Sequence, residues 1–264
     1  MRKFLVIGNP IDHSLSPKLH NYWIKVNQIQ ASYEKKLINE DDLENMIIMI
    51  RSGKIDGINV TVPFKRKIIP YLDELTSEAK ETKSVNTVYS DGKKTIGHNT
   101  DIAGFELGIR HFKYDVKNKK ILILGAGGVV SSIILALKKM SANKIFIHNR
   151  TIEKVMDLKR IFTEIDIFDW KKNVEIDMII NATSIGLNKN DKINFDLEKL
   201  GKDKFFYDII YNPSETNFLK EAKKLGNKTE NGKMMFIYQA HQSFSLWHKK
   251  FPKIDEETIK LIEK

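Results

Sequence analysis

The sequence of 264 residues contains no cysteine. Disulfides and thiolate-ligated metal sites are therefore excluded, and a reducing cytoplasm is a permitted location. The seven histidines show no ligand spacing such as His-x-x-x-His, so we predict no metal site. His13 and Ser14 cannot belong to a catalytic triad, because the side chains of adjacent residues diverge.

Long apolar runs are also absent. The best candidate for a membrane span, residues 121–137, is interrupted by glycines and serines and is too short. At the N-terminus, only the five residues 4–8 lie between the basic start of the chain and Asn9-Pro10, which is too short for the apolar core of a signal peptide. We expect a soluble, cytoplasmic protein without a membrane partner.

A concentrated basic segment is missing, although the formal net charge is +10. No basic block is interleaved with aromatic residues, so we expect no nucleic-acid partner; a solvated, lysine-rich surface that attracts anionic ligands is the simpler interpretation. Repeats and low-complexity tracts are absent. With 41% hydrophobic and 30% charged residues, the chain has the composition of a globular protein, and its length favours two domains.

What the sequence does contain is a glycine-rich loop between a strand and a helix, in residues 121–137. An apolar run of strand length breaks at Gly125, which permits a tight turn, and Gly127 lets the backbone approach a pyrophosphate at the start of the next helix. Val130 takes the place of the third glycine of the usual spacing, so helix and strand should pack less closely there. This pattern predicts a dinucleotide-binding unit.

The following strand, Lys144–His148, ends where a dinucleotide-binding unit selects its cofactor. An NAD enzyme would place a carboxylate there, whereas this chain has Asn149-Arg150-Thr151, with Lys154 one turn further on. A guanidinium can pair with a 2′-phosphate, so we predict NADP as the cofactor. The alternative is an ordinary loop with a solvated arginine.

In the first part of the chain, residues 4–8 are predicted as a buried strand and Ser16-Pro17 as the start of a helix. The apolar residues of that helix that share one face are Leu19, Tyr22, Trp23 and Val26. Ser14 and Ser16 lie beside the helix N-terminus, at the carboxyl end of a strand, and could bind a carboxylate. The alternative is that Ser16 only caps the helix.

A second strand is predicted over residues 31–37, a helix over 41–51 and a third strand over 55–62. The residues of this helix that should point inward are Leu43, Met46, Ile47 and Ile50. Pro63 ends the third strand, which places Thr61 and Lys65 at its exit, where open α/β sheets bind ligands. In a run of three cations, most should face solvent, so the position alone does not identify Lys65 as catalytic.

The Asp91-Gly92 pair between two strand-like runs predicts a hairpin with a two-residue turn. Folding this hairpin brings Asn86 near Gly97 and predicts that Asn86 meets Asp101 at its open end. The alternative for Asp101 is a cap on the helix that begins at Ile102.

The rest of the chain alternates helices and strands, with helices predicted over residues 152–162 and 215–225 and strands over 178–182 and 205–209. A last helical pattern follows Asn231-Gly232 and continues to Trp247. We predict an α/β protein of two domains, an open twisted sheet for the substrate and a Rossmann-like domain for NADP. The predicted bounds are 1–101 with 238–264 for the first and 102–237 for the second.

Taken together and in order, these motifs resemble the shikimate dehydrogenase family, NADP-dependent enzymes that interconvert 3-dehydroshikimate and shikimate. The resemblance covers essentially the full chain. Its motifs are Ser14-Leu15-Ser16-Pro17, Asn59-Val60-Thr61-Val62-Pro63-Phe64-Lys65, Asn86-Thr87, Asn99-Thr100-Asp101-x-x-Gly104, Gly125-Ala126-Gly127-Gly128, Asn149-Arg150-Thr151, Ala182-Thr183-Ser184, Asp208-x-x-Tyr211-x-Pro213-x-x-Thr216 and Gln239-Ala240.

The resemblance implies a role for each matching residue. Those that would hold the substrate carboxylate are Ser14, Ser16, Thr61 and Tyr211, and those around the ring oxygens are Lys65, Asn86, Asp101 and Gln239. Those bordering NADP(H) are Gly125, Ala126, Gly127, Gly128, Val129, Asn149, Arg150, Thr151, Lys154, Ile209 and Gly232. The departures from the family pattern are Val130, Asn217, Gln242 and Lys233-Met234.

Lys65 is the predicted proton donor and acceptor, and Asp101 the acceptor that orients both Lys65 and a ring hydroxyl. Domain closure about a hinge near residues 102 and 237 is expected, in a monomer or a homodimer. The alternatives are a quinate/shikimate-type dehydrogenase of the same family and, in a different class, a non-catalytic NADP-binding module.

Overall fold

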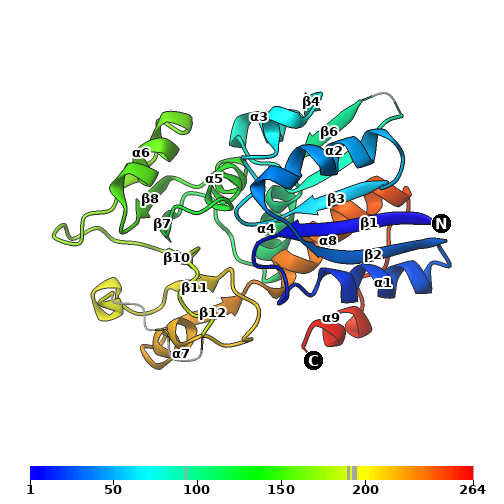
Figure 1. The fold of residues 1–264 in the computed structure, drawn as a ribbon. Helices are drawn as coiled ribbons and strands as arrows, with labels where there is room; N and C mark the ends of the chain where they lie inside the picture. Colours follow the sequence, from blue (N-terminus) through cyan, green and yellow to red (C-terminus); the bar gives the residue numbers. More distant parts are fainter. Residues whose placement is uncertain (93, 189–190, 192–194, 264) are drawn as a thin grey trace. The chain divides into compact units, whose positions relative to one another are not determined.

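The structure is a computed structural model that describes residues 1–92, 94–188, 191 and 195–263. The chain forms two compact units, one made of Met1–Gly104 with Ile237–Lys264 and the other of Phe105–Phe236. The boundaries between the units lie inside two helices, α4 (Asp101–His111) and α8 (Lys233–His248). Each unit contains its own six-stranded sheet (Figure 1), so the prediction of an α/β protein with two sheets is confirmed.

The sheet of the first unit has the strand order β2-β1-β3-β5-β6-β4. Strand β1 pairs in parallel with β2 and β3, whereas β3, β5 and β6 pair antiparallel to one another. The strands are β1 (Arg2–Gly8), β2 (Ala31–Leu37), β3 (Gly57–Val60), β4 (Glu74–Leu75), β5 (Thr87–Ser90) and β6 (Thr95–His98).

Helices cover both faces of this sheet, with α1 and α2 on opposite sides in Figure 1. Besides α4 and α8, the helices are α1 (Ser16–Val26), α2 (Leu43–Arg51), α3 (Ser77–Thr82) and α9 (Glu256–Glu263), with short 3-10 turns at Glu40–Asp42 and Ile69–Tyr71. The inward face predicted for α2 is confirmed, since Leu43, Met46, Ile47 and Ile50 are all buried against the sheet.

The inward face of α1 was predicted only in part. Leu19 and Trp23 are buried as expected, but Tyr22 is only half-buried and Val26 is 60% exposed, and His20 and Ile24 are buried instead. The reason is the partner surface: His20 stacks on Tyr33 of β2 at 4.1 Å between ring centroids, which turns the helix toward its histidine side. Hydrophobicity alone could not identify a buried histidine.

The second unit contains a parallel sheet of order β12-β11-β10-β7-β8-β9, in which each adjacent pair is parallel. Its strands are β7 (Lys120–Leu124), β8 (Lys144–His148), β9 (Asp166–Ile167), β10 (Met178–Asn181), β11 (Phe205–Asp208) and β12 (Lys228–Asn231). Its helices are α5 (Val130–Lys139), α6 (Ile152–Ile161) and α7 (Asn217–Lys224), with a 3-10 turn at Leu197–Leu200. The crossing from β7 through α5 to β8 has the topology expected for a dinucleotide-binding unit.

One local prediction, the two-residue turn of the hairpin, was wrong. The hairpin does not turn over two residues, because β5 ends at Ser90 and β6 begins at Thr95, with the Asp91 side chain accepting from the Lys94 N–H. Lys93 of this connection lies outside the described residues. Sequence analysis also missed several elements, namely α3, α9, β4, β9 and β12. The missed elements are short, and the two-residue strands β4 and β9 exist only through their neighbours in the sheets.

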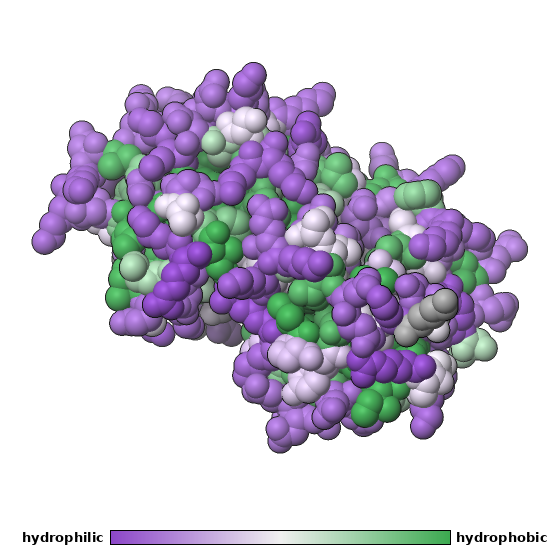
Figure 2. All heavy atoms as spheres, turned by 90° about the horizontal axis from the view of Figure 1, so that it is seen from above, coloured by the Kyte–Doolittle hydropathy of each residue, from purple (hydrophilic) through white to green (hydrophobic). Residues whose placement is uncertain are grey.

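Within the described part of the chain, no helix has the length and apolar character to cross a membrane. The face drawn in Figure 2 is mostly hydrophilic, with small apolar areas between the charged side chains.

Candidate active site

A buried ion pair joins Lys65 to Asp101. The Lys65 ammonium lies 2.5 Å from Oδ2 of Asp101, and the two side chains are 11% and 7% exposed. Lys65 follows the turn that closes β3, and its carbonyl accepts from the N–H of Val85 at 2.8 Å, which fixes the backbone there. The two neighbouring cations differ: Arg66 is exposed and Lys67 forms an exposed ion pair with Glu40. Lys65 is thus the cation of this run that packing holds in place.

Asn86 connects this pair to the hairpin. Its Nδ2 donates to Asp101 Oδ1 and to Thr100 Oγ1, both at 2.9 Å, so the predicted meeting of Asn86 and Asp101 is confirmed. The orientation of the amide is determined, because Oδ1 accepts from the backbone N–H of Thr100 at 2.7 Å. Asp101 is itself the first residue of α4, rather than a cap outside a helix that begins at Ile102.

Ser14 and Thr61 lie in the loops that leave β1 and β3, and Ser16 is the first residue of α1. The Thr61 N–H donates to Ile7 of β1 at 2.9 Å, and the Ser16 N–H lies 3.4 Å from Oγ of Ser14. Ser16 does not cap α1, since the N-cap is Leu15 and no side chain bonds the free amides there. The alternative interpretation of Ser16 as a helix cap is therefore wrong.

The glycine-rich loop follows β7 in the second unit. Gly125 has φ +109°, and a Cβ there would lie 2.8 Å from the carbonyl oxygen of Ala182, so both its conformation and the space require glycine. Gly127 is exposed, and Val129 is the N-cap of α5 without a side-chain cap. At the start of α5 the N–H groups of Val130 and Ser132 donate to the carbonyls of Gly127 and Val129, and no side chain caps this end of the helix, whose dipole favours an anion. Val130 is completely buried at the first position of the helix.

The turn after β8 presents two cations. Asn149 Nδ2 donates to the Thr151 carbonyl at 2.7 Å and shapes the turn. Arg150 and Lys154 are exposed, and neither has an ion-pair partner among the described residues. Two uncompensated cations beside the start of α6 create a local positive potential that suits a phosphate.

Gly232 and Tyr211 are placed by close packing in the second unit. A Cβ on Gly232 would lie 2.0 Å from the carbonyl oxygen of Ile209, so no larger residue fits without moving the backbone. The Tyr211 ring stacks on Phe236 at 4.4 Å. Gln239 is half-buried on α8, in the part of that helix that belongs to the first unit.

Sequence reasoning missed a second buried network at the ends of β10 and β11. Asp208 accepts from Thr216 Oγ1 at 2.7 Å, from the N–H of Ile210 at 3.0 Å and from Nδ2 of Asn181 at 3.1 Å. Burial raises the pKa of Asp208 to about 6, although these hydrogen bonds act in the opposite direction. The motif around Asp208 was visible in the sequence, but its burial was not.

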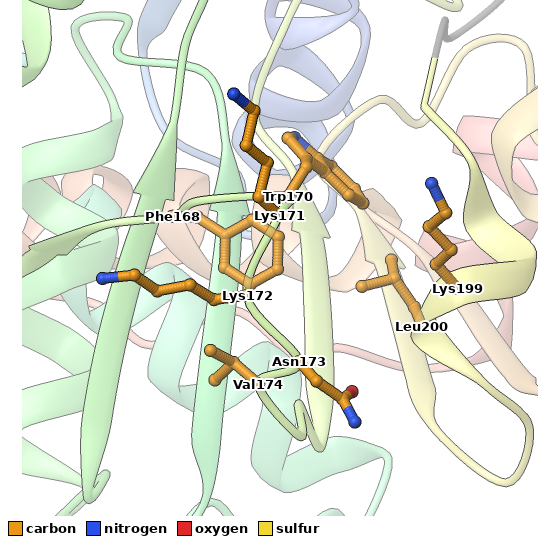
Figure 3. Close-up of a pocket in the computed structure, with 8 residues that line it drawn as sticks. All are labelled: Phe168, Trp170, Lys171, Lys172, Asn173, Val174, Lys199 and Leu200. Carbon is orange, nitrogen blue, oxygen red and sulfur yellow. The ribbon is translucent and has the colours of Figure 1, made fainter.

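A cavity of about 180 Å³ lies in the second unit (Figure 3). It is lined by Phe168, Trp170, Lys171, Lys172, Asn173, Val174, Lys199 and Leu200. None of these is a predicted site residue. Among the described residues, no group of three or more acidic or histidine side chains is arranged to hold a metal ion.

Comparisons with known proteins fit both units. Residues 6–88 match the family described as "Shikimate dehydrogenase substrate binding domain", and residues 106–212 match "Shikimate / quinate 5-dehydrogenase". The chain is 60% identical over 262 residues to "Shikimate dehydrogenase (NADP(+))" of Pelagibacter ubique, with 99% of each chain covered. A protein with the same name from Staphylococcus haemolyticus is 40% identical, with 99% of this chain and 98% of the relative covered.

Solved structures agree. The shikimate dehydrogenase of Aquifex aeolicus has a TM-score of 0.90 at 37% identity and covers 99% of this chain and 97% of its own. The enzyme of Thermus thermophilus, solved in complex with NADP(H) and shikimate, has a TM-score of 0.90 at 29% identity, with 100% and 98% covered. Two domain matches, close full-length relatives and a shared fold thus confirm the resemblance, and the chain belongs to the shikimate dehydrogenase family.

Proposed function

We propose that this protein catalyses the reversible, NADPH-dependent reduction of 3-dehydroshikimate to shikimate, a step of the shikimate pathway of aromatic amino acid biosynthesis. The observation that carries the proposal is the buried Lys65–Asp101 pair, which joins the loop after β3 to the first residue of α4. A ketone reduction needs a proton source at the carbonyl oxygen, and a lysine held by a carboxylate is suited to this role. The relative at 60% identity is named "Shikimate dehydrogenase (NADP(+))", which denotes the same reaction.

In the proposed mechanism, Lys65 donates a proton to the oxygen that becomes the hydroxyl, and takes it back in the reverse reaction. Asp101 holds the ammonium and accepts from a ring hydroxyl, and Asn86 fixes the position of Asp101. Gln239 completes the set around the ring oxygens. The carboxylate would be held by Ser14, Ser16, Thr61 and Tyr211, of which Ser14 and Thr61 occupy the loops after β1 and β3 and Ser16 begins α1.

The second unit would bind NADP(H), which supplies the hydride when bound. The residues present fit this group: Gly127, Gly128 and Val129 lead into the uncapped start of α5, and Arg150 and Lys154 offer charge for the 2′-phosphate. Ile209 and Gly232 would border the cofactor, and their tight contact fixes the local backbone.

In this proposal the first unit is the substrate-binding domain and the second the NADP-binding domain. Closure about a hinge near residues 102 and 237 stays a prediction; both positions lie inside helices, α4 and α8. A cytoplasmic location and an assembly of one or two chains belong to the same proposal.

The test is the initial rate of NADP+ reduction with shikimate, with quinate and NAD+ as controls. The proposal expects shikimate with NADP+ to be preferred. A preference for quinate would indicate the quinate-type alternative, which the second family description also names. No change in NADPH absorbance with either acid would indicate a non-catalytic NADP-binding module.

A further inference from the structure

Behind Lys65 and Asp101, polar side chains continue across the sheet of the first unit. The Tyr33 hydroxyl on β2 donates to Asn59 Oδ1 on β3 at 2.6 Å, and Asn59 Nδ2 donates to Thr87 Oγ1 on β5 at 3.0 Å. Thr87 Oγ1 then donates to Asn86 Oδ1 at 3.1 Å, and Asn86 Nδ2 donates to Asp101. These four hydrogen bonds form one buried chain that ends at the carboxylate that holds Lys65.

Backbone groups determine the orientation of the two amides in this chain. Asn59 Nδ2 also donates to the carbonyl of Asn86 at 3.1 Å, so its Oδ1 must face Tyr33. The Tyr33 hydroxyl must therefore donate to it. Asn86 is oriented by the Thr100 N–H, as described above, so its Nδ2 must face Asp101. The Tyr33 hydroxyl and both amides thus donate toward the acid. The Thr87 hydroxyl lies 3.1 Å from Asn86 Oδ1 and 3.3 Å from Oγ1 of Thr100.

The register of the sheet explains why Asn59 and Thr87 meet. Asn59 lies directly opposite Thr87 in the antiparallel pair β3–β5, where facing side chains are in contact distance. Tyr33 is 1% exposed and Thr87 is fully buried, in a setting where a polar group is costly unless it is hydrogen-bonded. A fully paired polar chain in a buried sheet fixes the position of each member. Apolar side chains of the same size would pack there without this constraint.

We propose that Tyr33 and Thr87 are positioning residues for the proton transfer, acting through Asn59 and Asn86 on the Asp101–Lys65 pair. This inference rests on the proposed function, because it assigns a catalytic consequence to that pair. Without the Tyr33 hydroxyl, Asn59 loses the partner of its Oδ1. Without the Thr87 hydroxyl, the link between the two amides is interrupted, and Asn86 has one fewer bond to hold it against Asp101.

The variants that test the chain each remove one hydroxyl. Tyr33→Phe and Thr87→Val should lower kcat about three- to tenfold, the effect of one net hydrogen bond. KM for shikimate should stay within threefold of wild type in Thr87→Val, whereas it should also rise in Tyr33→Phe, because the Tyr33 hydroxyl bonds Ser16, one of the residues proposed to hold the carboxylate. In the reduction of 3-dehydroshikimate, the deuterium isotope effect on kcat with 4-deuterated NADPH should rise, because the chemical step becomes slower. Thr87→Ser restores the hydroxyl and should recover most of kcat.

Two matched controls remove buried or half-buried hydroxyls elsewhere. Tyr114→Phe removes a hydroxyl that bonds the Asp177 carbonyl in the second unit, and Thr258→Val removes a buried one on α9. Both should leave kcat and the isotope effect unchanged, even where the melting temperature falls. A loss of kcat in these controls equal to that in Thr87→Val would show a general packing effect and overturn the inference.

A measurement without turnover separates the two proposals. In ligand-free protein, the side-chain amide signals of Asn59 and Asn86 should shift and exchange faster with solvent in Tyr33→Phe and Thr87→Val than in the controls. If the wild type reduces no NADP+ with shikimate, the proposed function fails and the catalytic consequence of the chain fails with it. If the wild type is active but both variants keep kcat within twofold and unchanged amide signals, only the inference is wrong.

Discussion

The ammonium of Lys65 and the carboxylate of Asp101 are 2.5 Å apart and almost buried. They are separated by 36 residues in the sequence and are brought together by the loop after β3 and the start of α4. A buried pair of this kind is held by hydrogen bonds to both partners, and removing one partner leaves the other charge uncompensated. The pair therefore makes specific predictions about substitutions.

Lys65→Ala should lower kcat on the order of a hundredfold or more, because the proton source is lost. KM for shikimate should stay within a few-fold, since the carboxylate contacts remain. The matched control is Lys67→Ala, which removes an exposed cation two residues away and should keep normal turnover. Steady-state kinetics checks both, and near-normal turnover of Lys65→Ala would remove Lys65 from this role.

Arg150→Ala should raise KM for NADPH by about tenfold, the effect of a charge-assisted contact, and leave KM for NADH nearly unchanged. The reason is that only NADPH carries the 2′-phosphate that this cation would meet. Lys223→Ala, an exposed lysine on α7, serves as the control for net charge. An equal effect of Arg150→Ala on both cofactors would argue against the assigned contact.

Two glycines of the second unit should respond differently to alanine. Gly232→Ala places a Cβ 2.0 Å from the Ile209 oxygen and should lower stability by about 1 to 3 kcal/mol or more. At Gly127 the nearest atom to a Cβ is 3.9 Å away, so Gly127→Ala should fold normally and weaken only NADPH binding. Thermal melts and NADPH titrations separate the two effects; equal melting temperatures would contradict the close contact at Gly232.

Asp208 should make the protein less stable as the pH rises from about 4 to 6. Its pKa rises from 3.8 in the unfolded chain to about 6 in the fold, so the folded state holds a proton that the unfolded state has released. The full effect, present above pH 6, is at most about 3 kcal/mol at 1.36 kcal/mol per pKa unit. In Asp208→Asn this part of the pH dependence should disappear, which urea unfolding at pH 4 to 7 can test.

His20 should act in the opposite direction. Burial, with a smaller repulsion from His248, lowers the pKa of His20 to about 3, and neither ring nitrogen has a hydrogen-bond partner among the described residues. The unfolded chain binds a proton near pH 6.5, so this residue removes stability progressively as the pH falls from about 6.5 toward 3. His20→Phe, which keeps a ring on Tyr33, should be less sensitive to acid. An unchanged acid response would contradict the depressed pKa.

Local patterns predicted much of this fold. Strands β2 and β8 have the predicted bounds, and the inward residues of α2 are those that helical spacing selects. The loop at Gly125 and its place between β7 and α5 also followed from the sequence. Such features depend on backbone conformation and on periodicity within about ten residues, which neighbouring residues express directly.

The candidate site was predicted less completely. The meeting of Asn86 and Asp101 followed from the hairpin, but the sequence did not show which of three adjacent cations is buried. Asn59 begins the family motif that ends at Lys65, but it was assigned no role. A polar residue inside a buried strand indicates a hydrogen-bonded partner, so its importance could have been recognised. Tyr33 gave no signal at all, because its partner lies 26 residues away across the sheet.

The sequence by itself determined the order of helices and strands, the glycine loop and the family to which the chain belongs. The tertiary structure alone decided which polar groups are withdrawn from water, and with that the Tyr33–Asn59–Thr87 chain, the raised pKa of Asp208 and the neutral His20. The physical reason is that burial and hydrogen-bond partnership arise from contacts between segments distant in the sequence, which no local pattern records.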